Sequence, residues 1–289
     1  MASLRDIRRK IGAVKKTQQI TKAMNMVAAS KLRGAQMRME NFRPYAAKFG
    51  EVLGNLAGRV EQERFALLRQ PTEVKKVGVL LITADRGLCG SFNTNLINNC
   101  EKFARQLKAE GKELSLVCVG KKGRDFFRRR KFNIVQGHVD VMGRFGYDLA
   151  ARLGADLTNS FIAGEVDEVY IIYSRFISLV RQIPDRRRLL PIAPAEAKVE
   201  AGGVEHIFEP SVDVLLEAML PKNINIQVFD ALLQTNTGEH AARMTAMDNA
   251  TRNCKDMITD LTLSMNKARQ AAITKELMDI VGGAEALKG

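Results

Sequence analysis

The sequence predicts an α/β protein in which a long antiparallel coiled coil, made by helices from the two ends of the chain, is joined to a central Rossmann-like α/β domain. Two observations favour the coiled coil, because residues 1–57 and residues 208–289 each carry apolar side chains at spacings of three and four. A third favours the central domain, because strand and helix patterns alternate through residues 74–195. We expect these three ranges to be the domains.

The N-terminal helix is predicted from a seam of residues that contains no proline before Pro44. The middle of the seam is polar. A neighbouring stripe of Ile20, Met24 and Val27 predicts that the buried face shifts partway along the helix. The seam consists of Leu4, Ile7, Ile11, Val14, Gln18, Thr21, Asn25, Ala28, Leu32, Ala35, Met39 and Phe42.

The C-terminal helix carries a second seam, with no glycine or proline between Gly238 and Gly282. We expect His240, which lies on this seam, to pack or to hydrogen-bond between the helices. A helix of forty-odd residues extends roughly 65 Å, more than a small domain, so pairing is favoured over the alternative that both helices wrap the central domain. The seam consists of Ile226, Phe229, Leu233, Asn236, His240, Arg243, Met247, Ala250, Cys254, Ile258, Leu261, Met265, Ala268 and Ala272.

The middle of the chain predicts a parallel sheet, because its strands alternate with helices. We expect residues 182–194 to form an exposed loop followed by an edge segment, and residues 195–203 to form a surface connection. The expected strands are Val74–Thr83, Leu114–Val119, a short Ile134–Val135 and Val166–Tyr173, and the expected helices are Phe92–Glu110, Lys121–Lys131 and Arg144–Ala163.

Positive charge is concentrated in two places. The formal net charge is +13, and residues 1–48 hold twelve Lys and Arg against Asp6 and Glu40, a net charge of +10. Such a field favours an acidic or polyanionic partner, which leaves nucleic acid, lipid and acidic protein open beside a simple solvated basic face. The second cluster consists of Lys121, Lys122, Arg124, Arg128, Arg129, Arg130 and Lys131.

No catalytic, cofactor-binding or metal site is predicted. The four cysteines lack metal or C-x-x-C spacing, which predicts free buried thiols in a reducing compartment. The three histidines are scattered, and no nucleophile–base pair can be assembled. No signal peptide and no apolar run of about 20 residues is present, so we expect a soluble or peripheral protein.

Residues 83–91 follow the first predicted strand and open a helix, the position of a phosphate loop in nucleotide-binding folds. The segment Thr-Ala-Asp-Arg-Gly-Leu-Cys-Gly-Ser matches neither G-x-G-x-x-G nor G-x-x-x-x-G-K-[ST], and it lacks the lysine that contacts the β- and γ-phosphates. We therefore expect a tight turn that needs glycine, with a nucleotide site as the alternative.

Three motifs, in order along the whole chain, carry a resemblance to a known family. The pattern Ile-Thr-x-Glu-x-x-Asp-x-x-x-Gly-Ala begins at Ile273, residues 20–31 form a second motif, and Asp-Arg-Gly-Leu-Cys-Gly at residues 85–90 forms a third. Together they resemble the gamma subunit of rotary ATP synthases. The resemblance implies a shaft that enters a hexamer of alpha and beta subunits, one shaft per hexamer, while the beta subunits perform the chemistry.

The resemblance also implies partner contacts. Lys22, Lys31 and Met24 would face an acidic loop of the beta subunits, and Arg243 would make a further polar contact. The tip of the C-terminal helix would contact the hexamer through Arg269, Gln270, Ile273, Thr274, Glu276, Leu277, Asp279 and Ile280. The central domain would stand on the membrane ring of c subunits with the epsilon subunit, and the candidate contacts there are Phe42, Arg43, Tyr45, His206, Phe208 and Glu209.

The same resemblance implies a peripheral position on the cytoplasmic face of a bacterial plasma membrane, with membrane contact only through the complex, and no cofactor. The inserted cysteine pair of photosynthetic relatives is missing, so no thiol switch is expected. Two alternatives compete with the rotor. A basic nucleic-acid-binding coiled coil would show salt-sensitive binding, and a nucleotide-dependent enzyme would bind ATP or NAD as the isolated chain.

Overall fold

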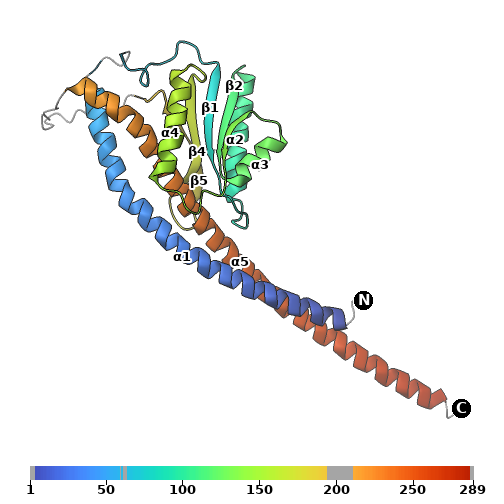
Figure 1. Ribbon diagram of the computed structural model, residues 1–289. Coiled ribbons are helices and arrows are strands. Elements are labelled where there is room, and N and C mark those ends of the chain that lie inside the picture. Colours follow the sequence, from blue (N-terminus) through green and yellow to red (C-terminus); the bar gives the residue numbers. More distant parts are fainter. Residues whose placement is uncertain (1–3, 59, 61–63, 194–210, 287–289) are drawn as a thin grey trace. The chain divides into compact units, whose positions relative to one another are not determined.

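The computed structural model describes residues 4–58, 60, 64–193 and 211–286. The chain divides into two compact units, residues 1–28 with 244–289 and residues 29–243. Ten helices and strands follow one another along the described residues (Figure 1): α1 Leu4–Ala57, β1 Lys76–Ile82, α2 Phe92–Ala109, β2 Glu113–Val119, α3 Lys121–Arg129, β3 Ile134–His138, α4 Tyr147–Ile162, β4 Glu168–Phe176, β5 Gln182–Leu190 and α5 Val212–Ala286.

The sheet of the central domain has the order β3-β2-β1-β4-β5. The pairs β1–β2, β1–β4 and β2–β3 are parallel, as the sequence predicts, whereas β4 and β5 are antiparallel. The sheet is therefore mixed and not parallel throughout. Strand β5 lies at the edge of the sheet, as expected for this range, but it begins already at Gln182, where a loop was expected. Arg186 stacks on Phe103 at 4.0 Å, and Arg188 pairs with Glu168. Residues from other elements thus hold this strand in place.

Helices cover both faces of the sheet (Figure 1). Alternate strand residues point to opposite faces, so Leu80 and Ile82 join one apolar cluster while Val79 and Leu81 join the other. The first cluster also contains residues of α4 and of the long helices α1 and α5, and the second contains residues of α2 and α3. A strand buried on both sides accounts for the continuous apolar run of β1.

Both long helices continue through a proline, Pro44 in α1 and Pro221 in α5. Proline inside a helix costs about 3 kcal/mol. Packing beyond each proline offsets this cost, because Leu56 and Ile224 are fully buried. Beside Pro44, Phe42 packs edge-on against Phe229 with 4.8 Å between the ring centroids. None of the described helices has an apolar stretch that could cross a membrane.

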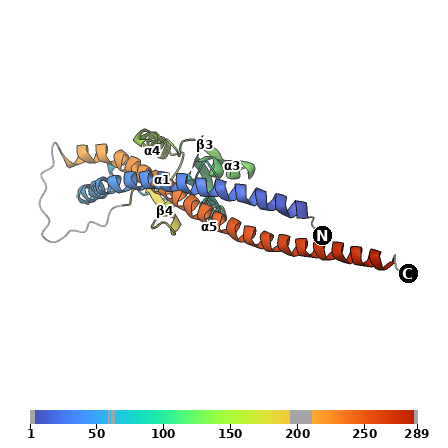
Figure 2. The same cartoon turned by 90° about the horizontal axis from the view of Figure 1, so that it is seen from below.

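In the unit of residues 1–28 and 244–289, α1 and α5 run alongside each other (Figures 1 and 2). The Asn25 side-chain amide donates to the Met244 carbonyl oxygen at 2.9 Å, and the Thr251 hydroxyl donates to the Thr21 hydroxyl at 2.8 Å. The two helices are therefore antiparallel, as predicted. These bonds give Thr21 and Asn25, in the polar middle of the seam, hydrogen-bond partners on α5, so that Thr21 is buried and Asn25 half-buried in the interface.

The predicted shift of the buried face of α1 is wrong. Ile20 and Val27 are 60% and 57% exposed, whereas the seam residues Thr21 and Ala28 are buried. The hydrogen bonds of Thr21 and Asn25 to α5 explain the difference, because they hold the polar residues in the interface without any change of face. In the apolar stripe beside the seam, Ile20 and Val27 are therefore left exposed and Met24 is half-buried.

Candidate functional site

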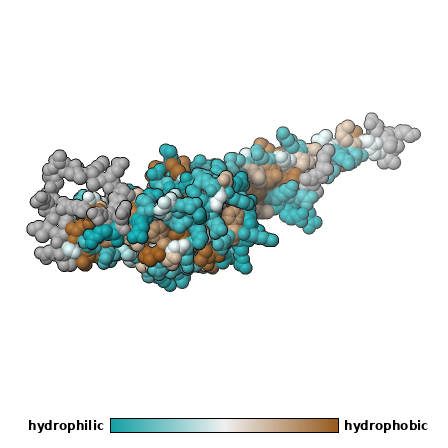
Figure 3. All heavy atoms as spheres, turned by 90° about the horizontal axis from the view of Figure 1, so that it is seen from above, coloured by the Kyte–Doolittle hydropathy of each residue, from teal (hydrophilic) through white to brown (hydrophobic). Residues whose placement is uncertain are grey.

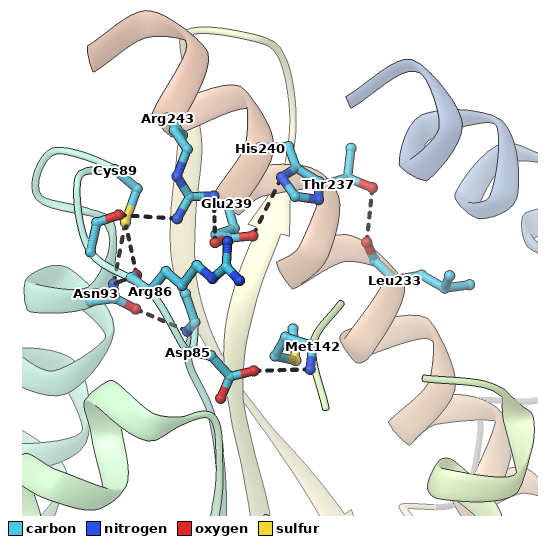
Figure 4. Close-up of polar contacts among 12 residues, drawn as sticks. Asp85, Arg86, Cys89, Asn93, Met142, Leu233, Thr237, Glu239, His240 and Arg243 are labelled. Carbon is cyan, nitrogen blue, oxygen red and sulfur yellow. Dashed lines mark hydrogen bonds and ion pairs between the residues drawn. The ribbon is translucent and has the colours of Figure 1, made fainter. Parts of the chain in front are cut away.

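The loop of residues 83–91 lies at the carboxyl end of β1. Its polar groups are hydrogen-bonded to other residues of the same chain (Figure 4). Leu88 and Gly90 have positive φ angles, 63° and 59°, which fits the expected tight turn. The Asn93 side chain accepts from the Ala84 amide at 2.9 Å and donates to the Arg86 carbonyl oxygen and to the Cys89 sulfur, both at 3.2 Å. Asn93 thus closes the loop onto the first turn of α2.

Asp85 ties this loop to two other segments. Its carboxylate accepts backbone amides of Lys121 at 3.0 Å, Asp140 at 2.9 Å and Met142 at 3.1 Å. These amides lie at the start of α3 and in the segment after β3. Three amide donors on one carboxylate form a strong set of charge-assisted bonds. Asp85 therefore ties the loop after β1 to the start of α3 and to the segment after β3.

A buried cluster on α5 meets the same loop (Figure 4). Arg243 donates to the Gly87 carbonyl oxygen at 3.0 Å and pairs with Glu239 at 2.6 Å. The side chains of Arg243 and Glu239 are only 12% and 8% exposed. Nδ1 of His240 lies 3.5 Å from Glu239. Burial raises the pKa of the Cys89 thiol nearby, against the lowering effect of Arg243.

His240 should make the chain sensitive to mild acid. Burial lowers its pKa below the ordinary 6.5; Glu239 opposes this, and Arg243 and Lys31 of α1 add to it. The unfolded chain therefore takes up the proton first as pH falls below about 6.5, and the folded state loses stability there. We expect the urea midpoint of the wild type to fall more steeply between pH 7 and pH 5 than that of His240→Gln. Equal slopes would contradict this role.

The predicted tip residues all lie on a stretch of α5 that no described part of α1 accompanies. The Thr21–Thr251 contact sets the antiparallel register, and since both helices rise equally per residue, Leu4 lies near the level of Ala268. Beyond Ala268, every residue through 284 except Ala272 is exposed. Apolar side chains are included, with Ile273 50%, Leu277 57%, Met278 68%, Ile280 69% and Val281 57% exposed.

The other predicted hexamer contacts differ in exposure. Lys22 and Lys31 are exposed, and Met24 is half-buried. Arg243 is largely buried and already bonded to Glu239 and Gly87. Arg243 therefore differs from the exposed candidates in being buried and already bonded within the chain. The contact of Arg243 with the hexamer stays a prediction.

The predicted ring contacts are only partly described. Phe42 is half-buried, and Arg43 and Tyr45 are exposed next to it. His206, Phe208 and Glu209 lie outside the described residues. Hydrophilic residues predominate on the face drawn in Figure 3, where apolar residues form smaller patches. Among the described residues, no group of three or more His, Cys, Asp or Glu could hold a metal ion.

Sequence reasoning missed Glu239, Asp85 and Asn93. Glu239 stands next to a seam histidine and four residues before Arg243, so the i,i+4 spacing was a usable signal for an ion pair. Asp85 and Asn93 were present in or beside a recognised motif. Asn93 acts within the loop itself, but the role of Asp85 depends on the backbone amides of residues 121, 140 and 142. That proximity arises only when the sheet forms.

Comparison with known proteins gives one consistent result. The family model described as ATP synthase matches residues 3–287. The chain is 58% identical over 292 residues to the ATP synthase gamma chain of Syntrophobacter fumaroxidans and 53% identical over 293 residues to that of Nitratidesulfovibrio vulgaris, with 100% of each chain covered.

Solved structures give the same result at the level of the fold. The central stalk and c-ring structure of the Tetrahymena thermophila mitochondrial ATP synthase matches with a TM-score of 0.61 and 27% identity, covering 80% of this chain and 99% of that one. A chain of the Euglena gracilis mitochondrial ATP synthase matches with a TM-score of 0.68 and 21% identity, covering 98% and 94%.

Proposed function

Since the chain belongs to the family of ATP synthase gamma chains, we propose that it turns inside a hexamer of alternating alpha and beta subunits, with one chain per hexamer. It is the rotor shaft of the enzyme and a non-catalytic subunit, coupling rotation to conformational change at the catalytic sites. The stretch of α5 beyond Ala268 would make contacts with the hexamer, and its exposure in the chain alone is the observation that supports this function.

This stretch is one helix whose apolar side chains share a broad face, because most of them follow spacings of three and four residues from Ile273. A surface helix normally buries such an apolar stripe against another element. Ile273, Leu277, Met278, Ile280 and Val281 are each half or more exposed in the chain alone. We infer that a sleeve of the hexamer covers them, and that these apolar contacts, which lack direction, allow rotation.

The shaft would act as a cam. A contact shifts a conformational equilibrium only by its different interaction with the two states. In the paired region the shaft presents different faces, with the exposed Ile20 and Val27 on one helix and the exposed Met257 and Leu263 on the other. Three beta subunits placed around it would therefore meet different surfaces. Rotation would exchange these surfaces among the three catalytic sites in turn.

The basic first helix gives this contact an electrostatic part. An exposed lysine near an acidic surface contributes about 0.2–1 kcal/mol, and such charges act mainly on orientation and approach. Lys22 and Lys31 are exposed on α1, and we propose that both face an acidic loop of the beta subunits. This role accounts for the positive charge of α1 without nucleic acid.

Charge reversal tests this assignment. We expect Lys22→Glu with Lys31→Glu to lower ion pumping per ATP hydrolysed by a factor of a few in vesicles that carry the assembled enzyme, because repulsion replaces attraction at each acidic loop. The matched control is Lys102→Glu with Lys108→Glu, which makes the same change of charge on exposed positions of α2. Unchanged pumping in the first variant, or equal loss in both, would exclude the role.

The central domain would provide the contact with the membrane part of the complex. We propose that it stands with an epsilon subunit on the membrane ring of c subunits, with Phe42, Arg43 and Tyr45 as candidate contacts beside His206, Phe208 and Glu209. The protein would then lie on the cytoplasmic face of a bacterial plasma membrane as part of the complex. The exposed ring of Tyr45, 5.7 Å from that of Phe42, supports a contact there.

A further inference from the structure

Strand β3 forms one edge of the central sheet, and one of its residues presents its backbone outward. β3 pairs only with β2 among the described strands. The His138 carbonyl oxygen accepts from the Gly120 amide, so His138 and, two residues earlier, Gln136 turn their backbone groups toward β2. Backbone groups alternate in direction along a strand. The N–H and C=O of Gly137 therefore point away from the sheet, where a further strand could pair.

A groove of about 370 Å³ runs beside this edge, between β3 and α3. Helix α3 and strand β3 lie next to each other (Figure 2). Val135, which is 59% exposed, borders the groove. Its floor and walls combine apolar and cationic groups, and the described lining includes no acidic side chain: Arg124, Arg128, Phe132, Ile134, Val135, Gln136 and Gly137.

The charge around the groove is strongly positive. Residues 121–131 contain seven Lys and Arg and one acidic residue, Asp125. Asp125 pairs with Arg124 at 2.6 Å, and Glu101 of α2 pairs with Arg130. The remaining five basic residues, Lys121, Lys122, Arg128, Arg129 and Lys131, are exposed. The rotor contacts proposed above use none of them.

We propose that this edge and groove bind an extended acidic segment of a partner protein, which adds to β3 as a sixth strand. Its backbone would exchange hydrogen bonds with Gly137, the mode of recognition known as β-augmentation. Because side chains alternate along a strand, every second residue would face α3, where a carboxylate could bond the Arg128 guanidinium in a bidentate arrangement. None of the proposed rotor contacts lies on this surface, so the inference goes beyond the rotor function.

The test uses the full chain and a synthetic peptide. A fluorescein-labelled acidic peptide that alternates valine and glutamate is titrated with the chain, and fluorescence anisotropy is measured. We expect saturable binding that Arg128→Glu weakens at least about tenfold. The matched variant Arg152→Glu, an exposed arginine on α4, should leave binding unchanged. Bound peptide should also slow hydrogen exchange of the Gly137 amide, which a purely ionic contact would not do.

Two further ligands decide between strand addition and simple charge attraction. The same peptide with alternate amides N-methylated keeps its charge but loses its strand hydrogen bonds, and we expect much weaker binding. Equal binding of the methylated peptide, equal loss in Arg128→Glu and Arg152→Glu, or no binding at all would overturn the proposal. Tighter binding of a short DNA duplex that Arg128→Glu abolishes would also overturn it, since the occupant would then be nucleic acid.

Discussion

Replacing Gly120 with alanine should destabilise the central domain by about 4 kcal/mol or more, the range reserved for severe single changes. Gly120 adopts φ 94° and ψ 140° between β2 and α3, a region that residues with a side chain rarely occupy. A Cβ at this position would lie 2.1 Å from the Thr83 carbonyl oxygen and 2.6 Å from its carbonyl carbon. Because the clashing atoms are backbone, no side-chain rotation can relieve the overlap.

Gly111→Ala is the matched control for this change. Gly111 also has a positive φ, 73°, but nothing lies within 4 Å of a Cβ there. It should therefore show only the backbone strain, about 1–2 kcal/mol. The chain has no Trp, and its four Tyr all lie in the unit of residues 29–243. Tyrosine fluorescence in urea thus follows the domain concerned. Equal losses in the two variants would show that contact with Thr83 is unimportant.

Replacing Glu239 with alanine should cost about 3–5 kcal/mol, because it leaves a buried guanidinium without its counter-charge. Arg243 is 12% exposed and would keep only its bond to the Gly87 carbonyl oxygen. The damage should reach the loop of residues 83–91, which that bond anchors to α5. The measurement is again the free energy of unfolding, with thiol labelling of the buried Cys89 as a local readout of loop opening.

Asp248→Ala provides the comparison on the same helix. Asp248 pairs with Arg252 at the same i,i+4 spacing, but the two side chains are 46% and 73% exposed. Removing an exposed pair of this kind should change stability by less than about 1 kcal/mol. If both variants lose the same small amount, the Glu239–Arg243 pair has no special structural role. Faster labelling of Cys89 only in Glu239→Ala would connect the pair to the loop.

The periodicity of apolar residues along the sequence accounts for the parts of the fold that were predicted well. The seam residues Ile7, Leu32 and Met39 are buried as expected, because helix periodicity alone decides which side chains share a face. Strand β3 was also expected, although the structure extends it to His138. Each of these predictions depends on residues close in sequence.

Contacts between distant segments account for the errors. β5 carries a proline and three consecutive arginines that suggest a loop, yet Arg186 and Arg187 stack on Phe103 and Tyr173 from other elements. The unshifted seam of α1 depends on Thr21 bonding to Thr251, far along the chain. The roles of the partner-contact residues could not be predicted from this sequence alone, because they depend on the surface of another subunit.

Reconstitution of the catalytic core tests the central claim most directly. The chain is expressed with the alpha and beta subunits of the same organism, the complex is purified, and its ATPase activity is measured with and without the chain. The rotor account predicts one chain per three alpha and three beta subunits, and sustained ATP hydrolysis that depends on its presence. A chain that fails to join the hexamer and instead elutes with nucleic acid in a salt-sensitive manner would contradict it.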